Sequence, residues 1–379
     1  MLIKKIIFGC FIVFIAVFCV CFSVSAVDIS AKSAVIIDAN GNEIVFEKEA
    51  FEKRSMASTT KIMTAILAIE SGKLGCEVSV TKEMTLAEGT SAGLRSGYRL
   101  TLEDLLYGMM LESGNDAANA VAIYLSGSLE AFSNMMNEKA KEIGMKSTHF
   151  VTPSGLDDEE HYSTAYDMAV LASYCIKNPC FRKICSTKRY TAQLAEPENF
   201  RLYFSNHNRL LTSVNGVFGV KTGFTKKSGR CLVSAIEKDG AVLIAVTLSA
   251  PDDWNDHKKL YASCLEQYIS TEEAIFCPDK VPVIGGKVGF VQVKPDCERV
   301  FVSTRKSEKI TQRTFFPRFV YAPVKENDVI GTVTVFAGKK ALKTVFLHAC
   351  GDVEAIGETF IPKKSLSERI KEKIKSLFS

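Results

Sequence analysis

Three short segments of this sequence carry side chains suited to covalent catalysis by a serine. In chain order they are Ser58-Thr59-Thr60-Lys61, Ser113-Gly114-Asn115 and Lys221-Thr222-Gly223. Each segment alone is weak evidence, because a serine that caps a helix, a Ser-Gly-Asn turn and an exposed Lys-Thr pair are common in folded proteins. Together they supply a nucleophile, a base and groups that bind a carboxylate, and this combination predicts an active site.

The spacing Ser-x-x-Lys places both side chains on one face of a helix, one turn apart, so that the Lys61 amine reaches the Ser58 hydroxyl. A lysine acts as a base only when it is neutral. Removal from water lowers the pKa of its ammonium group, and a second cation nearby, for which Lys221 is the candidate, lowers it further. Ser58 could then attack a carbonyl, and its backbone N–H at the start of the helix suits half of an oxyanion hole.

The other two segments supply groups for proton transfer and binding. Ser113 offers a hydroxyl that could relay a proton to a leaving amine, and Asn115 offers an amide that could hold the lysine and the substrate. Lys221 and Thr222 offer a cation and a hydroxyl to a carboxylate, while Gly223 lets a ligand approach the backbone closely. An extended peptide could pair along this strand edge.

Hydrophobic spacing and capping residues predict the helices that must position these groups. Apolar residues recur at helical spacing from Ser58 to Glu70, and Gly72 is placed to end this helix. Thr101, with Asp104 three residues on, forms a capping box that starts a second helix, which should stop near Ser113. Further helices are expected at 116–125, 129–143 and 164–177.

Strands are expected at both ends of the same region. The β-rich runs 34–38 and 43–46 flank an Asn-Gly turn and predict a hairpin. The runs 217–222, 230–237 and 241–248 predict three more strands, followed by a helix at about 254–269. Strands at both ends with helices between them indicate an α+β domain over 27–270, whose sheet joins its two terminal hairpins.

Two further segments follow this domain. Residues 276–357 contain short β runs separated by Gly, Pro and charged turns, which predict a small all-β domain. Its expected strands are 281–284, 290–293, 299–303, 319–321, 329–336 and 342–347. Residues 363–379 place apolar side chains on one helical face and six basic residues elsewhere, as expected for a helix lying on an anionic membrane surface. A helix docked on the protein itself, or a solvated tail, is the alternative.

The amino terminus has the pattern of an export signal. Lys4 and Lys5 precede an uncharged apolar stretch over 6–22, and small residues follow as far as Ala26. Residues 1–26 are therefore predicted to be a secretory signal peptide, with an uncleaved anchor helix as the alternative. Both interpretations place the remainder of the chain outside the cytoplasmic membrane.

Composition excludes several classes of protein. With 379 residues, 47% hydrophobic and 24% charged, the chain is long enough for two or three domains and is neither disordered nor collagen-like. Its 47 basic and 43 acidic residues nearly balance, which argues against a nucleic-acid partner. Cys175, Cys180 and Cys185 have no C-x-x-C or H-E-x-x-H motif nearby, so thiols are expected there, with no metal and no cofactor.

These motifs resemble those of the D-alanyl-D-alanine carboxypeptidases, the low-molecular-mass penicillin-binding proteins. The resemblance covers nearly the whole chain, including the β domain and the amphipathic tail. Beyond the three catalytic segments it rests on Met56-Ala-Ser-Thr-Thr-Lys-Ile-Met-Thr-Ala65, Leu105-Leu-Tyr-Gly-Met-Met110, Pro153-Ser-Gly-Leu-Asp157, His161-Tyr-Ser-Thr-Ala-Tyr-Asp167, Gly219-Val-Lys-Thr-Gly-Phe-Thr225 and Ala322-Pro-Val-Lys-Glu-Asn-Asp-Val-Ile-Gly331.

The resemblance implies a β-lactamase/transpeptidase-like fold and a serine carboxypeptidase. Such an enzyme removes the terminal D-alanine from peptidoglycan stem pentapeptides through an acyl-enzyme, acts in cell-wall biogenesis, and is inhibited covalently by β-lactam antibiotics. Carried over by position, Ser58 is the acylated nucleophile, Lys61 the proton acceptor, Ser113 the second catalytic hydroxyl and Lys221 the carboxylate binder. Some members have His where this chain has Phe224, and the expected oxyanion donor there is the backbone N–H, which Phe also supplies.

Two other functions are consistent with parts of the pattern. A β-lactamase shares the fold and the three motifs but must hydrolyse its acyl-enzyme quickly. Between Asn115 and Lys221 only Glu159 and Glu160 are candidates to activate the water, and they are loosely placed. A non-catalytic binder of wall peptides is the second alternative, with residues 276–357 as its interaction domain.

A fourth motif points to different chemistry. Gly89-Thr-Ser-Ala-Gly93 fits the nucleophile elbow of α/β-hydrolases, but no apolar strand precedes it and no helix follows it. Residues 85–100 are therefore expected to form a loop near the cleft.

Overall fold

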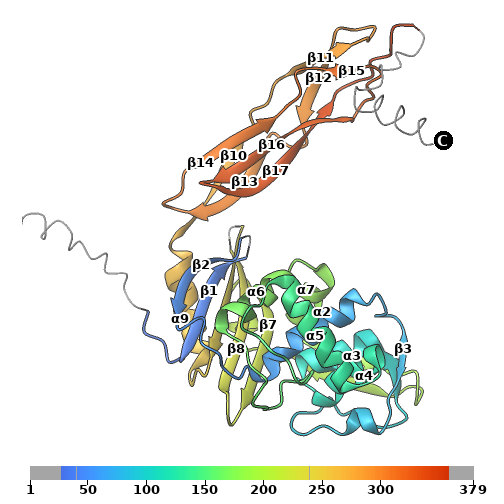
Figure 1. Cartoon of the computed structure of the whole chain (residues 1–379), viewed down its shortest axis with the longest axis vertical. Helices are drawn as coiled ribbons and strands as arrows, with labels where there is room; N and C mark the ends of the chain where they lie inside the picture. Colours follow the sequence, from blue (N-terminus) through green and yellow to red (C-terminus); the bar gives the residue numbers. More distant parts are fainter. Residues whose placement is uncertain (1–26, 40, 239, 358–379) are drawn as a thin grey trace, which may run out of the picture. The chain divides into compact units, whose positions relative to one another are not determined.

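The computed structural model describes residues 27–39, 41–238 and 240–357, which divide into two units (Figure 1). The first unit contains the described residues up to Glu237 together with Val242–Glu266. The second contains the described residues of Lys238–Ala241 and those from Gln267 onward. The predicted signal peptide 1–26 and the predicted amphipathic helix 363–379 lie outside the described residues. Within the described ranges, no helix is both long enough and apolar enough to cross a bilayer.

A five-stranded sheet with strand order β2-β1-β9-β8-β7 forms one layer of the first unit. Strand β1 pairs antiparallel with β9, with Val35 opposite Val246, so the sheet joins the terminal hairpins as predicted. All six residues of β1 are buried. The α+β fold class is confirmed. The strands are β1 (Ser33–Asp38), β2 (Glu43–Lys48), β7 (Val217–Thr225), β8 (Gly229–Lys238) and β9 (Ala241–Leu248).

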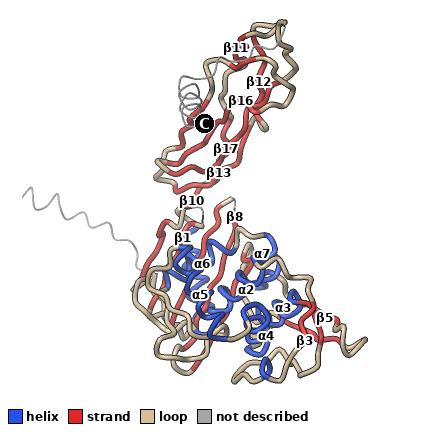
Figure 2. The backbone as a smooth tube through the Cα atoms, turned by 45° about the vertical axis from the view of Figure 1, so that its right-hand side comes forward, coloured by secondary structure: helices blue, strands red, loops and turns tan. Residues whose placement is uncertain are grey.

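Helices pack beside this sheet, with α2 among them (Figure 2). Nine of the ten residues of α2 are buried, which explains its nearly continuous apolar sequence. The helices are η1 (Ala57–Thr60), α2 (Lys61–Glu70), η2 (Glu83–Thr85), α3 (Leu102–Leu111), α4 (Asn115–Ser126), α5 (Leu129–Ile143), α6 (Ala165–Cys175), α7 (Pro179–Ser186), α8 (Leu210–Ser213) and α9 (Asp253–Leu265). Two short hairpins, β3 (Glu77–Ser79) with β4 (Arg99–Thr101) and β5 (Arg189–Gln193) with β6 (Arg201–Ser205), complete the unit.

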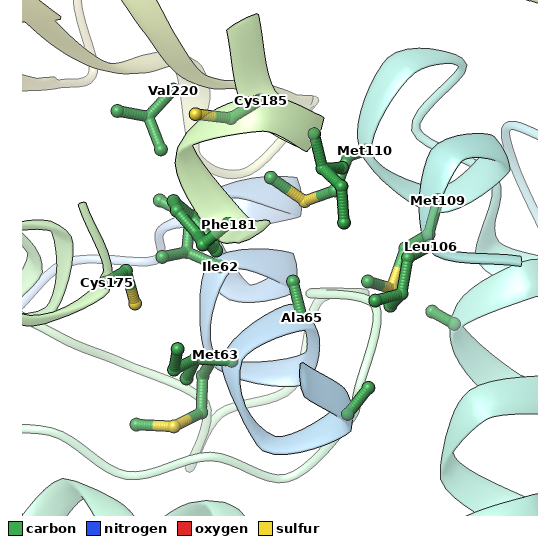
Figure 3. Packing of buried hydrophobic residues seen from close by; sticks show 14 of the residues in the cluster. Ile62, Met63, Ala65, Leu106, Met109, Met110, Cys175, Phe181, Cys185 and Val220 are labelled. Atoms are coloured by element: carbon green, nitrogen blue, oxygen red, sulfur yellow. The ribbon is translucent and has the colours of Figure 1, made fainter. Parts of the chain in front are cut away.

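The core around α2 fixes where the turn over residues 58–61, the predicted catalytic turn, begins. Ile62, Met63 and Ala65 on α2 belong to one buried cluster with side chains from α3, α7 and β7, among them Met110 and Phe181 (Figure 3). Burying a side chain of this size stabilises the fold by about 1.5–3 kcal/mol. The first turn of α2 is thereby held between the other helices and strand β7.

Most predicted helix ends are confirmed. Thr101 and Asp104 form the predicted capping box, and Gly144 ends α5 with a φ of 87°. Two predictions were incomplete: the turn at Ser58 is a separate 3₁₀ helix, η1, and the helix predicted at 254–269 ends at Leu265, before strand β10. The helices η2, α7 and α8 were not predicted.

The second unit is all β, as predicted. Its six-stranded sheet has the order β14-β16-β17-β12-β11-β15, and β10 pairs with β13. Val281, Val333 and Leu347 lie in its core. Strands β10 and β14 were not predicted. The first begins inside the segment predicted to be helical, and β14 has apolar side chains only at its two ends, Ile310 and Phe315. The strands are β10 (Tyr268–Ala274), β11 (Lys280–Ile284), β12 (Phe290–Pro295), β13 (Arg299–Arg305), β14 (Ile310–Phe315), β15 (Val320–Tyr321), β16 (Val329–Ala337) and β17 (Lys340–Ala349).

Candidate active site

The three segments predicted from sequence meet in the first unit. Ser58 lies in η1 and Lys61 begins α2, and the Lys61 Nζ is 2.9 Å from the Ser58 Oγ. Asn115 begins α4, and its Oδ1 lies 2.7 Å from the same Nζ. Strand β7 carries Thr222 and Gly223 along the edge of the sheet beside η1. The predicted nucleophile, the predicted base and the predicted binding strand are therefore adjacent.

The hydrogen bonds of Lys61 direct its lone pair at the serine. Its Nζ donates to the Asn115 Oδ1 and to the Ser154 carbonyl oxygen, both at 2.7 Å, and carbonyl oxygens only accept. A neutral amine has two N–H groups, so both are used by these partners. The lone pair then faces the Ser58 hydroxyl, which can donate to it. The Asn115 amide is held in this orientation because its Nδ2 donates to the Glu88 carbonyl at 2.5 Å.

Burial favours the neutral form of Lys61. The side chain is fully buried, and its pKa lies well below the usual value, first because of desolvation and second because of the charge of Lys221. The carboxylate of Asp116 acts in the opposite direction. Burial also lowers the pKa of Lys221 to about 7. The two effects that the sequence suggested for Lys61 therefore both operate.

A cleft of about 310 Å³ opens beside the serine. From the predicted set it is lined by Ser58, Ser113, Thr222, Gly223 and Phe224. The remaining wall includes several polar and charged side chains, namely Thr90, His207, Arg209, Arg230, Asp253 and Trp254. The volume suits a small ligand or the end of a peptide, and the basic side chains suit an anionic one.

Lys221 lies behind this wall. Its side chain is only 2% exposed, and its Nζ donates to the Thr222 carbonyl at 3.0 Å. It is not among the residues that line the cleft. A carboxylate in the cleft would thus contact Thr222, whereas the Lys221 charge would attract it without direct contact.

The backbone around Ser58 depends on one glycine and one strained residue. A Cβ added at Gly223 would lie 3.0 Å from the Ser58 nitrogen and 3.1 Å from the Thr59 nitrogen, so only glycine lets β7 run this close to η1. Ala57 has a φ of 47°, a left-handed conformation that non-glycine residues rarely adopt. Ser113, with a φ of 63°, is a second such residue. Left-handed non-glycine residues cluster at functional sites, and here they flank the cleft.

Three functional residues were missed by the sequence reasoning. Ser154 contributes through its main-chain oxygen, which leaves no signal in the side-chain pattern. His161 accepts from the Val151 N–H at Nδ1, so its Nε2–H donates to the Thr60 Oγ1 at 2.8 Å. Burial lowers the pKa of His161 to about 4, so the ring is neutral at physiological pH. The third is Asp116, next to Asn115, whose carboxylate acts on the charge of Lys61.

The residues proposed for other chemistry lie elsewhere. Glu159 and Glu160 are exposed and do not line the cleft. The segment 89–93 is a loop without the strand and helix of a nucleophile elbow, and Thr90 places it at the cleft as expected. Cys175 and Cys185 are buried thiols. Over 27–39, 41–238 and 240–357, His, Cys, Asp and Glu side chains form no group of three that could hold a metal.

Comparison with known proteins links this geometry to a family. Residues 21–252 match the family described as D-alanyl-D-alanine carboxypeptidase, and residues 269–355 match the penicillin-binding protein 5 C-terminal domain. The D-alanyl-D-alanine carboxypeptidase DacF of Bacillus subtilis is 31% identical over 354 residues, covering 89% of this chain and 90% of its own length.

Solved structures show the same likeness. Penicillin binding protein 5 from Haemophilus influenzae superposes with a TM-score of 0.61 at 26% identity, over 86% of this chain and 98% of its own. The D-alanyl-D-alanine carboxypeptidase DacD from Francisella tularensis gives a TM-score of 0.58 at 27% identity, over 87% and 95%.

Proposed function

This chain belongs to the family of D-alanyl-D-alanine carboxypeptidases, serine-type hydrolases of peptidoglycan metabolism, and from that membership we propose that Ser58 is its acylated nucleophile and Lys61 its general base. The observation that carries the proposal is the geometry of Lys61. Both of its N–H groups are taken by carbonyl oxygens, and its Nζ lies 2.9 Å from the Ser58 Oγ.

Acylation uses this arrangement directly. The Lys61 lone pair removes the Ser58 hydroxyl proton while the Oγ attacks the carbonyl carbon between the two terminal D-alanines of the stem peptide. The backbone N–H groups of Ser58 and Phe224 stabilise the resulting oxyanion. As the C–N bond breaks, Ser113 passes the proton from Lys61 to the leaving amine, so that free D-alanine departs and an ester remains on Ser58.

Deacylation uses the same base, with water in place of the serine as the nucleophile. A water molecule attacks the ester, Lys61 accepts its proton, and the Ser58 Oγ recovers a proton as the ester bond breaks. The products are the shortened peptide, with a new carboxylate, and the free serine. Glu159 and Glu160 are exposed and do not line the cleft. The acidic residue among the lining residues, Asp253, is paired with Arg230 at 2.9 Å, so its carboxylate is not free to activate water on a penicillin acyl-enzyme. Slow release of penicillin, and hence inhibition, is the expected result.

The substrate carboxylate has a binding site on β7. The Thr222 hydroxyl and the Gly223 backbone line the cleft, and Lys221 lies directly behind them. Arg209 adds positive charge to the same wall, whereas the charge of the Arg230 guanidinium is balanced by the Asp253 carboxylate 2.9 Å away. A peptide ending in a free carboxylate is therefore favoured over a capped one.

The export signal and the tail give the enzyme its place in the cell. Residues 1–26 have the pattern of a secretory signal, and residues 363–379 that of a basic amphipathic helix. The catalytic domain over 27–270 and the β domain over 276–357 would then act on the outer face of the cytoplasmic membrane, with the tail on its surface.

Replacing the serine tests the assignment. The Ser58→Ala variant should lose both covalent labelling by benzylpenicillin, read by mass spectrometry, and D-alanine release from a D-Ala-D-Ala peptide. A non-catalytic binder would show neither activity before the change and would keep its affinity for the peptide after it. Rapid benzylpenicillin hydrolysis without peptide cleavage in the unmodified protein would instead identify a β-lactamase.

A further inference from the structure

Asp116 holds a loop that the mechanism above does not explain. It follows Asn115 in the first turn of α4 and is 2% exposed. Its carboxylate accepts hydrogen bonds from the Ala92 N–H at 2.7 Å, the Leu94 N–H at 3.0 Å and the Ser91 hydroxyl at 2.6 Å. All three donors lie on the segment between η2 and β4. One buried carboxylate therefore ties this loop to the start of α4.

The same loop fixes the amide that holds the base. The Glu88 carbonyl accepts from the Asn115 Nδ2 at 2.5 Å, and the Thr90 carbonyl accepts from the Asn115 backbone N–H at 2.7 Å. The fit is close, because a Cβ added at Gly114 would lie 2.6 Å from the Ala92 Cβ. If the loop shifted, the Asn115 amide would lose the acceptor that keeps its Oδ1 facing the lysine.

Asp116 also acts on the charge of Lys61. Three groups affect the charge of the Lys61 amine or are affected by it: Lys221 on β7, Asp116 on α4, and His161 in the loop before α6, which is neutral at physiological pH. Burial and Lys221 both favour the neutral amine, whereas the Asp116 carboxylate favours the ammonium form. That ammonium is what Lys61 becomes when it takes the serine proton, so the carboxylate stabilises the charge that develops during acylation.

We infer that Asp116 is a positioning residue of this carboxypeptidase: it clamps the 88–94 loop so that Asn115 directs the Lys61 amine at Ser58, and its charge supports the ammonium formed there. The inference rests on the proposed role of Lys61 as the base. It assigns to Asp116 an effect on both rate and pH dependence, whereas a purely structural carboxylate would affect the rate alone.

The Asp116→Asn variant separates these two effects. Its Oδ1 still accepts the Ala92 and Ala117 N–H groups, but its amide NH₂ faces the Leu94 N–H, so the clamp loosens and the charge is lost. We expect kcat/KM for D-alanine release to fall at least about tenfold at the optimum. Activity is expected to fall at acid pH as Lys61 becomes protonated, and the midpoint of this fall is called the midpoint of the acid limb. It should move to lower pH by at least about half a unit, because Lys61 loses the charge that favours its protonation.

A matched control is available on α9. Asp256 is 1% exposed and accepts from the Ser30 N–H at 2.8 Å, the Ser30 hydroxyl at 2.8 Å and the Ala31 N–H at 2.9 Å. Like Asp116, it accepts hydrogen bonds from two backbone N–H groups and one serine hydroxyl, but it does not act on the charge of Lys61. The Asp256→Asn variant should keep the wild-type midpoint. An unmoved or raised midpoint in Asp116→Asn, or an equal shift in Asp256→Asn, overturns the inference.

A further variant keeps the charge in place and disturbs only the clamp. Ser91→Ala removes one donor to the Asp116 carboxylate. It should lower kcat/KM with the midpoint unchanged, and a shifted midpoint contradicts the inference even if Asp116→Asn does not fold. Loss of the acid limb in the unmodified enzyme, or D-alanine release by Ser58→Ala, would instead contradict the proposed function itself.

Discussion

The pKa values of the two lysines of the site are both lowered, and these shifts predict separate effects of pH on kcat and on KM. The pKa of Lys61 is lowered, so the amine is neutral and basic above that pKa and becomes protonated as the pH drops, which lowers kcat. The pKa of Lys221 is about 7, so its charge is lost as the pH rises through neutrality. The attraction for the substrate carboxylate then weakens, and KM should rise on the alkaline side.

Separate measurement of kcat and KM from pH 5 to 9 checks this assignment. The acid limb should appear in kcat and the alkaline limb in KM. Acylation by benzylpenicillin, which also carries a carboxylate, should follow the same two limbs. A kcat that stays flat from neutral to acid pH would show that Lys61 is not the base.

At the scale of the elements, the contact between β7 and η1 depends on a single missing side chain. A methyl group at Gly223 would lie 3.0 Å from the Ser58 nitrogen, so the Gly223→Ala variant should push the strand away from the catalytic turn. We expect kcat/KM to fall by roughly tenfold, because the neighbouring backbone must give by a few tenths of an ångström, whereas a displacement of about 1 Å at the reacting groups costs about a hundredfold. Thermal unfolding should change little.

Gly75→Ala provides the control for this substitution. A Cβ at Gly75 meets no atom within 4 Å, so this variant should keep full activity. If Gly223→Ala were as active as Gly75→Ala, the close approach of β7 would not be needed for catalysis.

The sequence predicted an element correctly where neighbouring residues determine its ends, and failed where a contact with a residue distant in the sequence determines them. The capping box at Thr101 and the glycine that ends α5 are local signals, and both helix ends were predicted correctly. The 3₁₀ turn η1 was not, because it depends on a distant contact: a Cβ at Gly155 would lie 1.9 Å from the Ala57 carbonyl oxygen. The contact between Ser58 and Lys61 was likewise predicted from their spacing, whereas the contact of Lys61 with the Ser154 carbonyl could not be predicted, since every residue has a carbonyl.

At the scale of the whole molecule, the two units have separate hydrophobic cores. The large cluster around α2 contains residues of the first unit, such as Met63 and Leu106. Two smaller clusters, rich in valine, contain residues of the second, such as Val281 and Val335. Because each core is complete within its unit, each unit should unfold as its own cooperative transition.

Acylation provides a way to separate the two transitions. Benzylpenicillin attached to Ser58 contacts only the first unit, so it should raise the temperature of that transition by several degrees and leave the other unchanged. Scanning calorimetry of the protein with and without the antibiotic measures both, and Ser58→Ala, which cannot be acylated, should show no shift. If acylation moved a single transition of the entire protein, the units would be coupled in folding, and the catalytic turn would depend on the β domain for its stability.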